Sequence, residues 1–136
     1  MKISAMSEYA CRALLELSRN YGKEQLLKIK DIAKNQNIPV PYLIQILQEL
    51  KRIGLVSSRR GSEGGYELTR SPGKITFGEV IRAIDGPLVP LVCLNTETDS
   101  VCIVEINCRF KQIWSRVDRA IGDVVDNITF EEICRN

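Results

Sequence analysis

The chain has 136 residues, with 44% hydrophobic and 26% charged side chains and a formal net charge of +2; this suits one soluble globular domain, or one domain with an arm. It contains no run of the roughly 18–20 apolar residues that a membrane helix needs. Charged residues interrupt the first twenty positions, so no signal peptide is expected and we predict a cytoplasmic protein without a membrane partner.

Apolar residues near the start of the chain recur at the spacing of one helix face: Met6, Tyr9, Ala10, Ala13, Leu14 and Leu17. They predict an amphipathic helix of about three to four turns, which Gly22 closes. A second, short helix is expected to end near Gln36. Asn37 then occupies a tight turn that needs a left-handed backbone conformation, which Asn tolerates better than most residues.

A third helix and a hairpin follow. Pro39 and Pro41 suit the first turn of a helix, and Gly54 ends it after a buried stripe of Leu43, Ile46, Leu47 and Leu50. Residues 55–60 and 66–69 then predict two strands. Residues 61–65 are their turn, where glycine supplies positive φ angles.

The remaining elements are indicated by capping boxes and by one long apolar stripe. Thr76 and Glu79 form a capping box that starts a helix, and residues 85–87, Asp-Gly-Pro, stop it. Residues 86–107 have no clear period. A helix of about five turns is expected from its stripe of Phe110, Ile113, Trp114, Val117, Ile121, Val124 and Ile128, and Thr129 starts a last short helix with a second capping box.

The second and third helices and the hairpin together predict a winged helix-turn-helix. In this unit the third helix enters the major groove of DNA and the wing contacts phosphates. The glutamines can read base edges, Tyr42 can bond a phosphate or contact a thymine methyl, and Arg59 and Arg60 project to opposite faces of their strand. The alternative is that these are ordinary exposed residues. The candidate DNA contacts are Pro41, Tyr42, Ile44, Gln45, Gln48, Ser57, Arg59 and Arg60.

The charge distribution points the same way. Residues 21–60 carry eight basic and three acidic side chains, a net charge of +5, whereas residues 85–136 carry five basic and nine acidic ones, a net charge of −4. A basic first half and an acidic second half indicate that the first half meets a polyanion. Charge alone leaves open the interpretation that the basic run is a solvated face.

Cys93, Cys102 and Cys108 form a second informative group, in a chain with five cysteines and no histidine. Thiols stay reduced in the cytoplasm, and the odd cysteine count argues against a closed disulfide framework. The spacing differs from the Cys-x2-Cys of zinc ribbons, whereas thiolates at an irregular loop can converge on an iron–sulfur cluster. The alternative is that the three are small buried hydrophobic residues.

Several motifs resemble those of the Rrf2-type winged helix-turn-helix regulators, the family that includes IscR, NsrR, RirA and CymR: Tyr42-Leu43, Gly54-Leu55-Val56-Ser57-Ser58, Arg60-Gly61 and Gly64-Gly65-Tyr66. The resemblance covers nearly the whole chain, and three more segments share it: Met1-Lys2-Ile3-Ser4, Gly78-Glu79-Val80-Ile81 and Ile128-Thr129. It implies a homodimer that binds palindromic, double-stranded promoter DNA, with the long C-terminal helix crossing onto the partner. Ile44 departs from the pattern, because several members have a polar base-reading residue there.

The resemblance also implies an iron–sulfur cluster, of the 2Fe–2S or 4Fe–4S type, bound by Cys93, Cys102 and Cys108. Some relatives add a histidine after the third cysteine, a region where this chain has Lys111. Others add an acidic residue from the first helix of the opposite subunit, a position that Glu8 matches. Glu8 is therefore the first candidate for a fourth ligand, with an ordinary exposed carboxylate as the alternative. Weaker candidates are Asp99, Glu105 and Cys134, and Cys11 is expected to be a small core residue.

We thus expect a mainly α-helical protein with a small β-hairpin wing. Residues 1–85 would form the winged helix-turn-helix DNA-binding domain, residues 86–107 a cysteine-bearing loop, and residues 108–136 a dimerisation helix and C-terminal segment. The expected function is a transcriptional regulator, repressor or activator, whose affinity for promoter DNA is set by the cluster in response to iron, redox state or nitric oxide.

Two other functions are alternatives to this one. A cluster-free regulator of the CymR type would be controlled by thiol oxidation or by a protein partner. An enzyme with a small-molecule substrate is not expected, because the sequence has no histidine, no nucleophile–base pair and no phosphate-binding loop followed by a helix.

Overall fold

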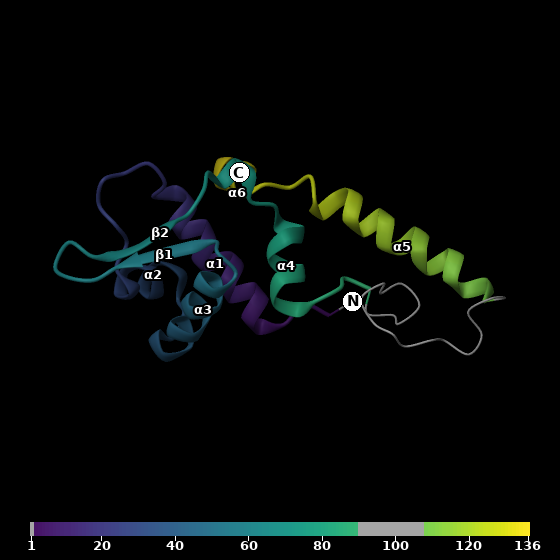
Figure 1. Ribbon diagram of the computed structural model, residues 1–136, viewed down its shortest axis with the longest axis horizontal. Helices are drawn as coiled ribbons and strands as arrows, with labels where there is room; N and C mark the ends of the chain where they lie inside the picture. Colours follow the sequence, from purple (N-terminus) through teal and green to yellow (C-terminus); the bar gives the residue numbers. More distant parts are fainter. Residues whose placement is uncertain (1, 90–107) are drawn as a thin grey trace.

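The computed structural model describes residues 2–89 and 108–136 (Figure 1). Cys93 and Cys102 therefore lie outside the described residues, as do Asp99 and Glu105. The helices are α1 Ala5–Arg19, α2 Ile29–Gln36, α3 Val40–Arg52, α4 Phe77–Asp85, α5 Arg109–Val125 and α6 Phe130–Arg135, with a 3-10 turn, η1, at Pro72–Lys74. The strands are β1 Val56–Arg59 and β2 Gly65–Leu68.

This arrangement confirms the predicted fold class, mainly helical with one antiparallel hairpin. Several residues predicted to start or end the helices do so in the structure. Asn37 adopts the left-handed conformation, with φ 50° and ψ 52°, in the turn between α2 and α3. Gly54 has φ +79° just after α3. The hydroxyl of Thr76 accepts a hydrogen bond from the Glu79 amide at 3.1 Å, and that of Thr129 accepts one from the Glu132 amide at 3.2 Å.

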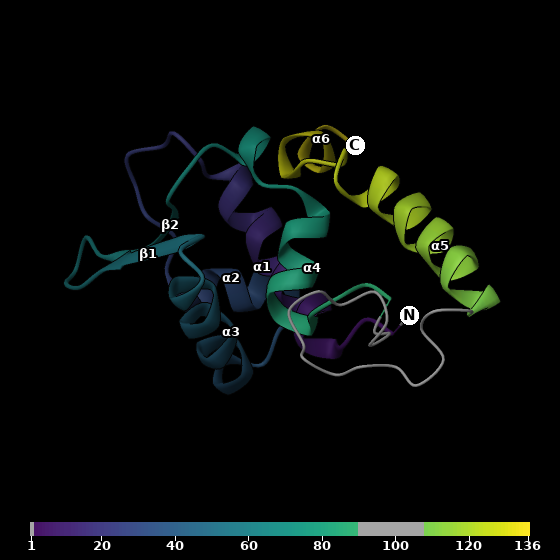
Figure 2. The ribbon, with the colours of Figure 1, turned by 45° about the vertical axis from the view of Figure 1, so that its right-hand side comes forward.

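The core is built around α1, which packs against α2 and α3 and also against α4 and α6. The ribbon shows α1 between these helices in both views (Figure 2). Four residues of its apolar stripe are buried, Ala10, Ala13, Leu14 and Leu17, whereas Met6 and Tyr9 are partly buried. α6 contributes Phe130, which is 1% exposed. The main buried residues of this core are Ala10, Ala13, Leu14, Leu17, Ile32, Leu43, Ile46, Leu47, Leu50, Leu55, Ile75, Val80 and Phe130.

The wing is held at its base by close backbone contacts. The hairpin pairs Val56 with Leu68 and Arg59 with Gly65. The amide of Tyr66 donates to the Leu27 carbonyl at 2.8 Å, and the Leu27 amide donates back at 3.2 Å. A Cβ on Gly65 would lie 2.6 Å from the Leu27 carbonyl oxygen, so only glycine allows this approach of the wing to the segment between α1 and α2.

α5 differs from the other helices because none of its residues is buried. It projects away from the core in both ribbon views. The predicted apolar stripe extended to Ile128, but α5 ends at Val125. Ile128 lies in the segment after the helix, where its carbonyl accepts a hydrogen bond from the Phe77 amide at the start of α4. Among the described residues, no helix has both the length and the apolar character needed to cross a membrane.

Candidate nucleic-acid interface

α3 has one buried and one exposed face. Pro39 caps its N-terminus and Pro41 lies in its first turn, where a missing amide proton costs no helical hydrogen bond. The apolar stripe predicted from the sequence faces the core. The predicted DNA-contacting residues of this helix all lie on the opposite, exposed face: Pro41, Tyr42, Ile44, Gln45 and Gln48.

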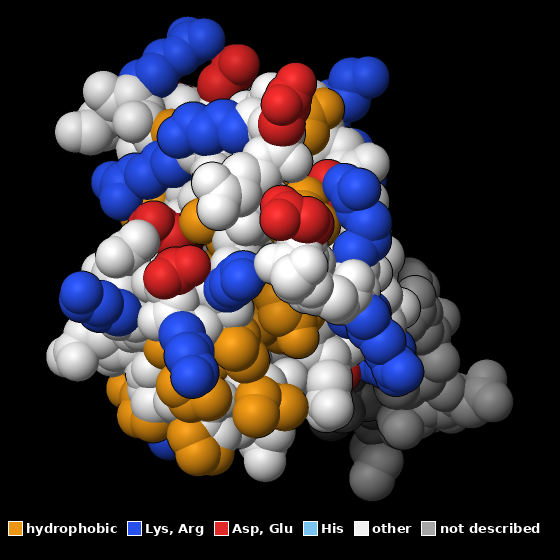
Figure 3. Space-filling view, turned by 90° about the vertical axis from the view of Figure 1, so that its left-hand side faces the viewer, with side chains coloured by type: hydrophobic (Ala, Val, Ile, Leu, Met, Phe, Trp, Pro, Cys, Tyr) orange, Lys and Arg blue, Asp and Glu red, His pale blue; other side chains and the backbone are white. Residues whose placement is uncertain are grey.

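The N-terminal half of this exposed face is unusually apolar. Val40 and Tyr42 are each 37% exposed, and Ile44 is 43% exposed. Seen from the wing side, the surface has a hydrophobic patch in its lower part, with Lys and Arg side chains spread around it (Figure 3). Such a surface suits a groove that presents thymine methyl groups and is bordered by phosphates.

The two wing arginines have different surroundings. Arg59 lies in β1, and its guanidinium is 3.3 Å from the Glu67 carboxylate on β2. Arg60 follows the strand, is exposed, and has no ion pair within the described part of the chain. Ser57 lies in β1 opposite Glu67 and is half-buried. Arg60 is therefore the wing cation that is available to a phosphate without first breaking a contact.

A contact that the sequence did not predict joins α3 to the wing. The Lys51 ammonium, in the last turn of α3, donates to the Ser58 hydroxyl of β1 at 2.7 Å. Neither residue belongs to a sequence motif that predicts this contact, so it is visible only in the folded structure. The contact places an additional cation between α3 and the wing.

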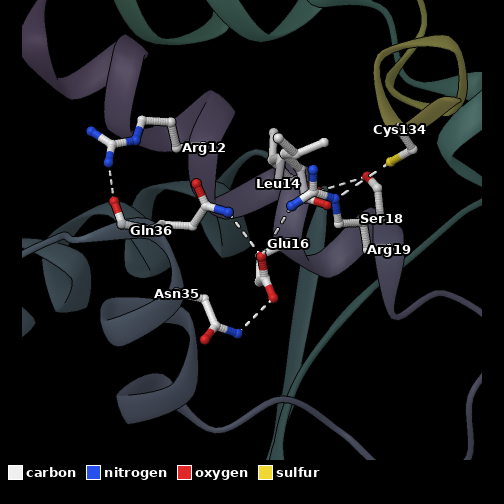
Figure 4. Close-up of polar contacts among 9 residues, drawn as sticks. Arg12, Leu14, Glu16, Ser18, Arg19, Asn35, Gln36 and Cys134 are labelled. Carbon is white, nitrogen blue, oxygen red and sulfur yellow. Dashed lines mark hydrogen bonds and ion pairs between the residues drawn. The ribbon is translucent and has the colours of Figure 1, made fainter. Parts of the chain in front are cut away.

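The C-terminal end of α2, next to the turn of the helix-turn-helix, is held by residues of α1 (Figure 4). The Glu16 carboxylate accepts hydrogen bonds from the side-chain amides of Asn35 and Gln36, each at 2.8 Å. Arg12 donates to the Gln36 carbonyl, at the C-terminus of α2, where a helix favours positive charge. These contacts fix α2 directly before the Asn37 turn.

Aromatic packing extends the clamp to α3. The rings of Tyr9 and Tyr42 meet edge to face, with centroids 5.4 Å apart. The Arg12 guanidinium lies 5.4 Å from the centroid of Tyr9 on the same helix. Tyr42 is thus held at the exposed start of α3 by a residue of α1.

The described cysteines differ in their environment. Cys108 is the half-buried N-cap residue of α5, and its side chain makes no capping hydrogen bond. Cys11 packs against the core, as expected, and burial together with the nearby Asp85 carboxylate raises the pKa of its thiol to about 12. Cys134 lies on α6 with its sulfur 3.9 Å from the Leu15 carbonyl, and burial raises its pKa.

Glu8 is well exposed in the first turn of α1. Its side chain is 67% exposed, and its carboxylate is 3.9 Å from the Arg12 guanidinium. Within residues 2–89 and 108–136, no three acidic or cysteine side chains lie close enough together to hold a metal ion. The predicted set of Cys93, Cys102, Cys108 and Glu8 stays a prediction, because its first two members lie outside the described residues.

The N-terminal end of α1 is tied to the root of the cysteine-bearing segment. The Asp85 carboxylate, directly before Gly86, accepts hydrogen bonds from the Ser4 amide at 2.9 Å and the Ser4 hydroxyl at 2.5 Å. Partial burial acts to raise the pKa of Asp85, but the bonds from Ser4 outweigh it and leave that pKa below its ordinary value.

The chain matches a known protein family and is similar in sequence to known regulators. Residues 3–136 match the family described as "Rrf2: Iron-dependent Transcriptional regulator". CymR of Bacillus subtilis is 34% identical over 133 residues, covering 98% of this chain and 89% of that protein. NsrR of Bacillus licheniformis is 33% identical over 136 residues, covering 100% of this chain and 94% of that protein.

Two solved structures of such regulators have a similar fold over nearly the whole chain. The structure of CymR, described as the global cysteine regulator of B. subtilis, has a TM-score of 0.81 at 31% identity and covers 99% of this chain and 97% of that chain. The structure of T. potens IscR has a TM-score of 0.74 at 31% identity, covering 99% and 87% of the two chains.

Proposed function

The chain belongs to the Rrf2 family of transcriptional regulators, and from this premise we propose that an iron–sulfur cluster sets its affinity for promoter DNA. It is a DNA-binding regulator and not an enzyme. The observation that carries the cluster proposal is the group Cys93, Cys102 and Cys108 in a chain similar to NsrR and IscR. The proposed location is the cytoplasm, because a regulator of this kind must reach promoter DNA.

The proposed DNA contacts combine α3 and the wing. The exposed start of α3 enters the major groove, where Gln45 and Gln48 reach base edges and Ile44 contacts thymine methyl groups. Arg60 and Arg59 bind phosphates, with Ser57 beside them. Pro41 and Tyr42 lie at the helix start, and the contact between Tyr9 and Tyr42 supports this assignment because it fixes the ring.

The proposed assembly is a homodimer through α5. This helix exposes large apolar side chains along one stripe: Phe110 at 65%, Ile113 at 52%, Trp114 at 41%, Val117 at 36% and Val124 at 58%. Apolar surface of this extent is typical of a protein interface. A two-fold dimer would present two copies of α3 to two half-sites of palindromic DNA.

The described candidates for ligands fit a cluster. Cys108 has a sulfur without a capping bond at the N-terminus of α5, a place that stabilises negative charge. Glu8 presents an exposed carboxylate, and its ion pair with Arg12 is long. Binding of this carboxylate to the cluster of another subunit would break that weak ion pair. Cys11 and Cys134 do not fit, because one thiol packs against the core and the other against the α1 backbone. When bound, the cluster supplies a reactive centre sensitive to iron supply, redox state or nitric oxide.

The chain's own residues offer a route from that site to DNA. Asp85 and Ser4 tie the root of the cysteine-bearing segment to the start of α1. α1 in turn holds the end of α2 through Glu16 and Arg12. A change in the position of α1 would therefore move the helix-turn-helix, which is the two-state coupling that regulation requires.

The ligand assignment is tested by anaerobic reconstitution of single Cys→Ala variants, followed by absorption spectra and iron and sulfide counts. Loss of Cys93, Cys102 or Cys108 should abolish the chromophore, whereas the matched Cys11→Ala and Cys134→Ala variants should keep it. Glu8→Ala should leave a more labile cluster, because one oxygen ligand contributes less than a thiolate. Full occupancy in any of the three thiolate variants would remove that residue from the site.

A cluster-free regulator is the second candidate. The similarity to CymR, at 34% identity in sequence and a TM-score of 0.81 in structure, supports it. Control would then come from thiol oxidation or a protein partner. The two candidates differ in the colour of the protein after anaerobic reconstitution. A wild-type protein that stays colourless is a regulator of the second, cluster-free type.

A further inference from the structure

α5 is attached to the rest of the molecule at one end. Of the described elements, α4 makes its main contacts. After α5, the chain is fixed by two backbone hydrogen bonds: the Phe77 amide donates to the Ile128 carbonyl at 2.8 Å, and the Phe130 amide donates to the Ile75 carbonyl at 3.0 Å. The remainder of α5 has no buried residue and extends outward.

A two-point ion pair fixes the angle at this end. The Arg82 guanidinium of α4 donates to both carboxylate oxygens of Asp126, the C-cap residue of α5, at 2.5 and 2.9 Å. Two parallel hydrogen bonds from a planar guanidinium constrain orientation as well as distance. This pair joins residues 44 positions apart in the sequence.

Gly78 in α4 lets the two helices come this close. A Cβ at Gly78 would lie 2.1 Å from the Asp126 Oδ1 atom and 2.7 Å from a Val125 methyl group. A Cβ there must displace the Asp126 carboxylate and the Val125 methyl group, and with them the contact that orients α5. Gly122 in α5 faces the same contact but has room, because its Cβ would lie 3.5 Å from Asp126 and 3.6 Å from Arg82.

The length of α5 amplifies small changes at this contact. Its 17 residues span about 25 Å at a rise of about 1.5 Å per residue. A tilt of about 10° at the attached end moves the other end by roughly 4 Å. That displacement is close to the rise of one base pair, about 3.4 Å.

We propose that the contact of Gly78, Arg82 and Asp126, called here the α4–α5 seam, determines the half-site spacing that the dimer accepts on DNA. This inference rests on the proposed function, a homodimer formed through α5. The seam sets the angle between the DNA-binding domain and the dimer helix in each protomer. The separation of the two α3 helices, and with it the preferred operator length, follows from that angle.

The test starts from duplexes that the wild-type protein selects from a randomised DNA pool. The centre of the selected site is lengthened or shortened by one and two base pairs, and each duplex is titrated with full-length wild type, Gly78→Ala, Arg82→Gln and the control Gly122→Ala. An isolated half-site duplex and sedimentation report whether each variant keeps an intact DNA-binding domain and dimer.

Wild type and Gly122→Ala should lose at least about fivefold in affinity for each base pair of altered spacing. Gly78→Ala and Arg82→Gln should shift the optimum by one base pair, or reduce the whole preference to less than about threefold, with half-site affinity within about twofold of wild type. Arg82→Lys keeps one contact to Asp126, so its spacing preference should be weaker than that of wild type and stronger than that of Arg82→Gln.

The inference is overturned if both seam variants, dimeric and able to bind a half-site, keep the wild-type spacing profile. It is equally overturned if Gly122→Ala shifts the profile as Gly78→Ala does, because the effect would then not be a clash. If Gly78→Ala does not fold, Arg82→Gln decides alone. A wild type that selects no paired half-sites would remove the proposed dimeric function and this inference together.

Discussion

Arg59 and Arg60 are neighbours in the sequence but not equivalent in the structure. Arg59 forms an exposed ion pair with Glu67, which contributes at most about 1 kcal/mol and can be exchanged for a phosphate contact. Arg60 needs no such exchange. We therefore expect Arg60 to contribute more to DNA binding, although the sequence gives the two residues the same weight.

Replacing Arg59 and Arg60 together by Ala should weaken binding to all DNA sequences. Each phosphate contact contributes about one unit to the slope of log affinity against log salt, so the slope should fall by up to about two. Titrations at several salt concentrations measure both quantities. Arg135→Ala, which removes an exposed arginine paired with Glu131 on α6, is the control; equal affinity and slope for the double variant and this control would contradict the wing assignment.

Cys11 should be chemically inert in the folded protein. With a thiol pKa of about 12, roughly one molecule in ten thousand carries the reactive thiolate at pH 8. Iodoacetamide should leave Cys11 unmodified at pH 8 and label it only after unfolding in urea, as peptide mass spectrometry would show. Rapid labelling under native conditions would contradict the packing of Cys11 against the core.

At the scale of elements, α5 provides the clearest prediction. Val117→Asp would place a charge in the middle of the exposed apolar stripe, and burying that charge in an interface is costly. The variant should be monomeric at micromolar concentration in sedimentation and should lose affinity for paired half-sites. Gln112→Asp, on the opposite side of the same helix, should remain dimeric. A dimeric, DNA-binding Val117→Asp protein would exclude this face as the interface.

The elements themselves were largely predictable from the sequence, because each depends on local signals. The spacing of apolar residues predicted the helices, Asn37 predicted the turn, and Thr76 predicted the start of α4. The contacts between elements were not predictable. Ser4 meets Asp85 across 81 positions, and no local pattern in either segment specifies its partner.

The same holds for the candidate DNA-contacting residues: their position on a helix was predictable from the sequence, but the contacts that hold them were not. The exposed face of α3 follows from helical periodicity, so the sequence places the five candidate residues of this helix on that face. The clamp from Glu16, the packing of Tyr9 on Tyr42 and the bond between Lys51 and Ser58 were not predictable. Each depends on the way in which α1, α3 and the wing pack together, which a single sequence does not reveal.

At the scale of the whole molecule, α4 connects the parts that regulation must couple. Successive turns of this helix contact the end of the wing, the long helix and the start of α1: Glu79 binds Arg70, Arg82 binds Asp126 and Asp85 binds Ser4. A change at the cysteine-bearing segment, which follows α4, can therefore reach the DNA-binding surface and α5 through packed and hydrogen-bonded residues. This arrangement offers a physical route for the cluster-dependent DNA affinity that we propose.

The most direct test compares the affinities of cluster-loaded and cluster-free protein for one DNA. Both forms are prepared anaerobically from the same wild-type batch and titrated against the selected duplex by fluorescence anisotropy at fixed salt. We expect Kd values that differ by at least about fivefold, the lower range of coupling between two linked sites. This difference should disappear in Cys108→Ala. Equal Kd values for the two wild-type forms would contradict the claim that the cluster sets DNA affinity.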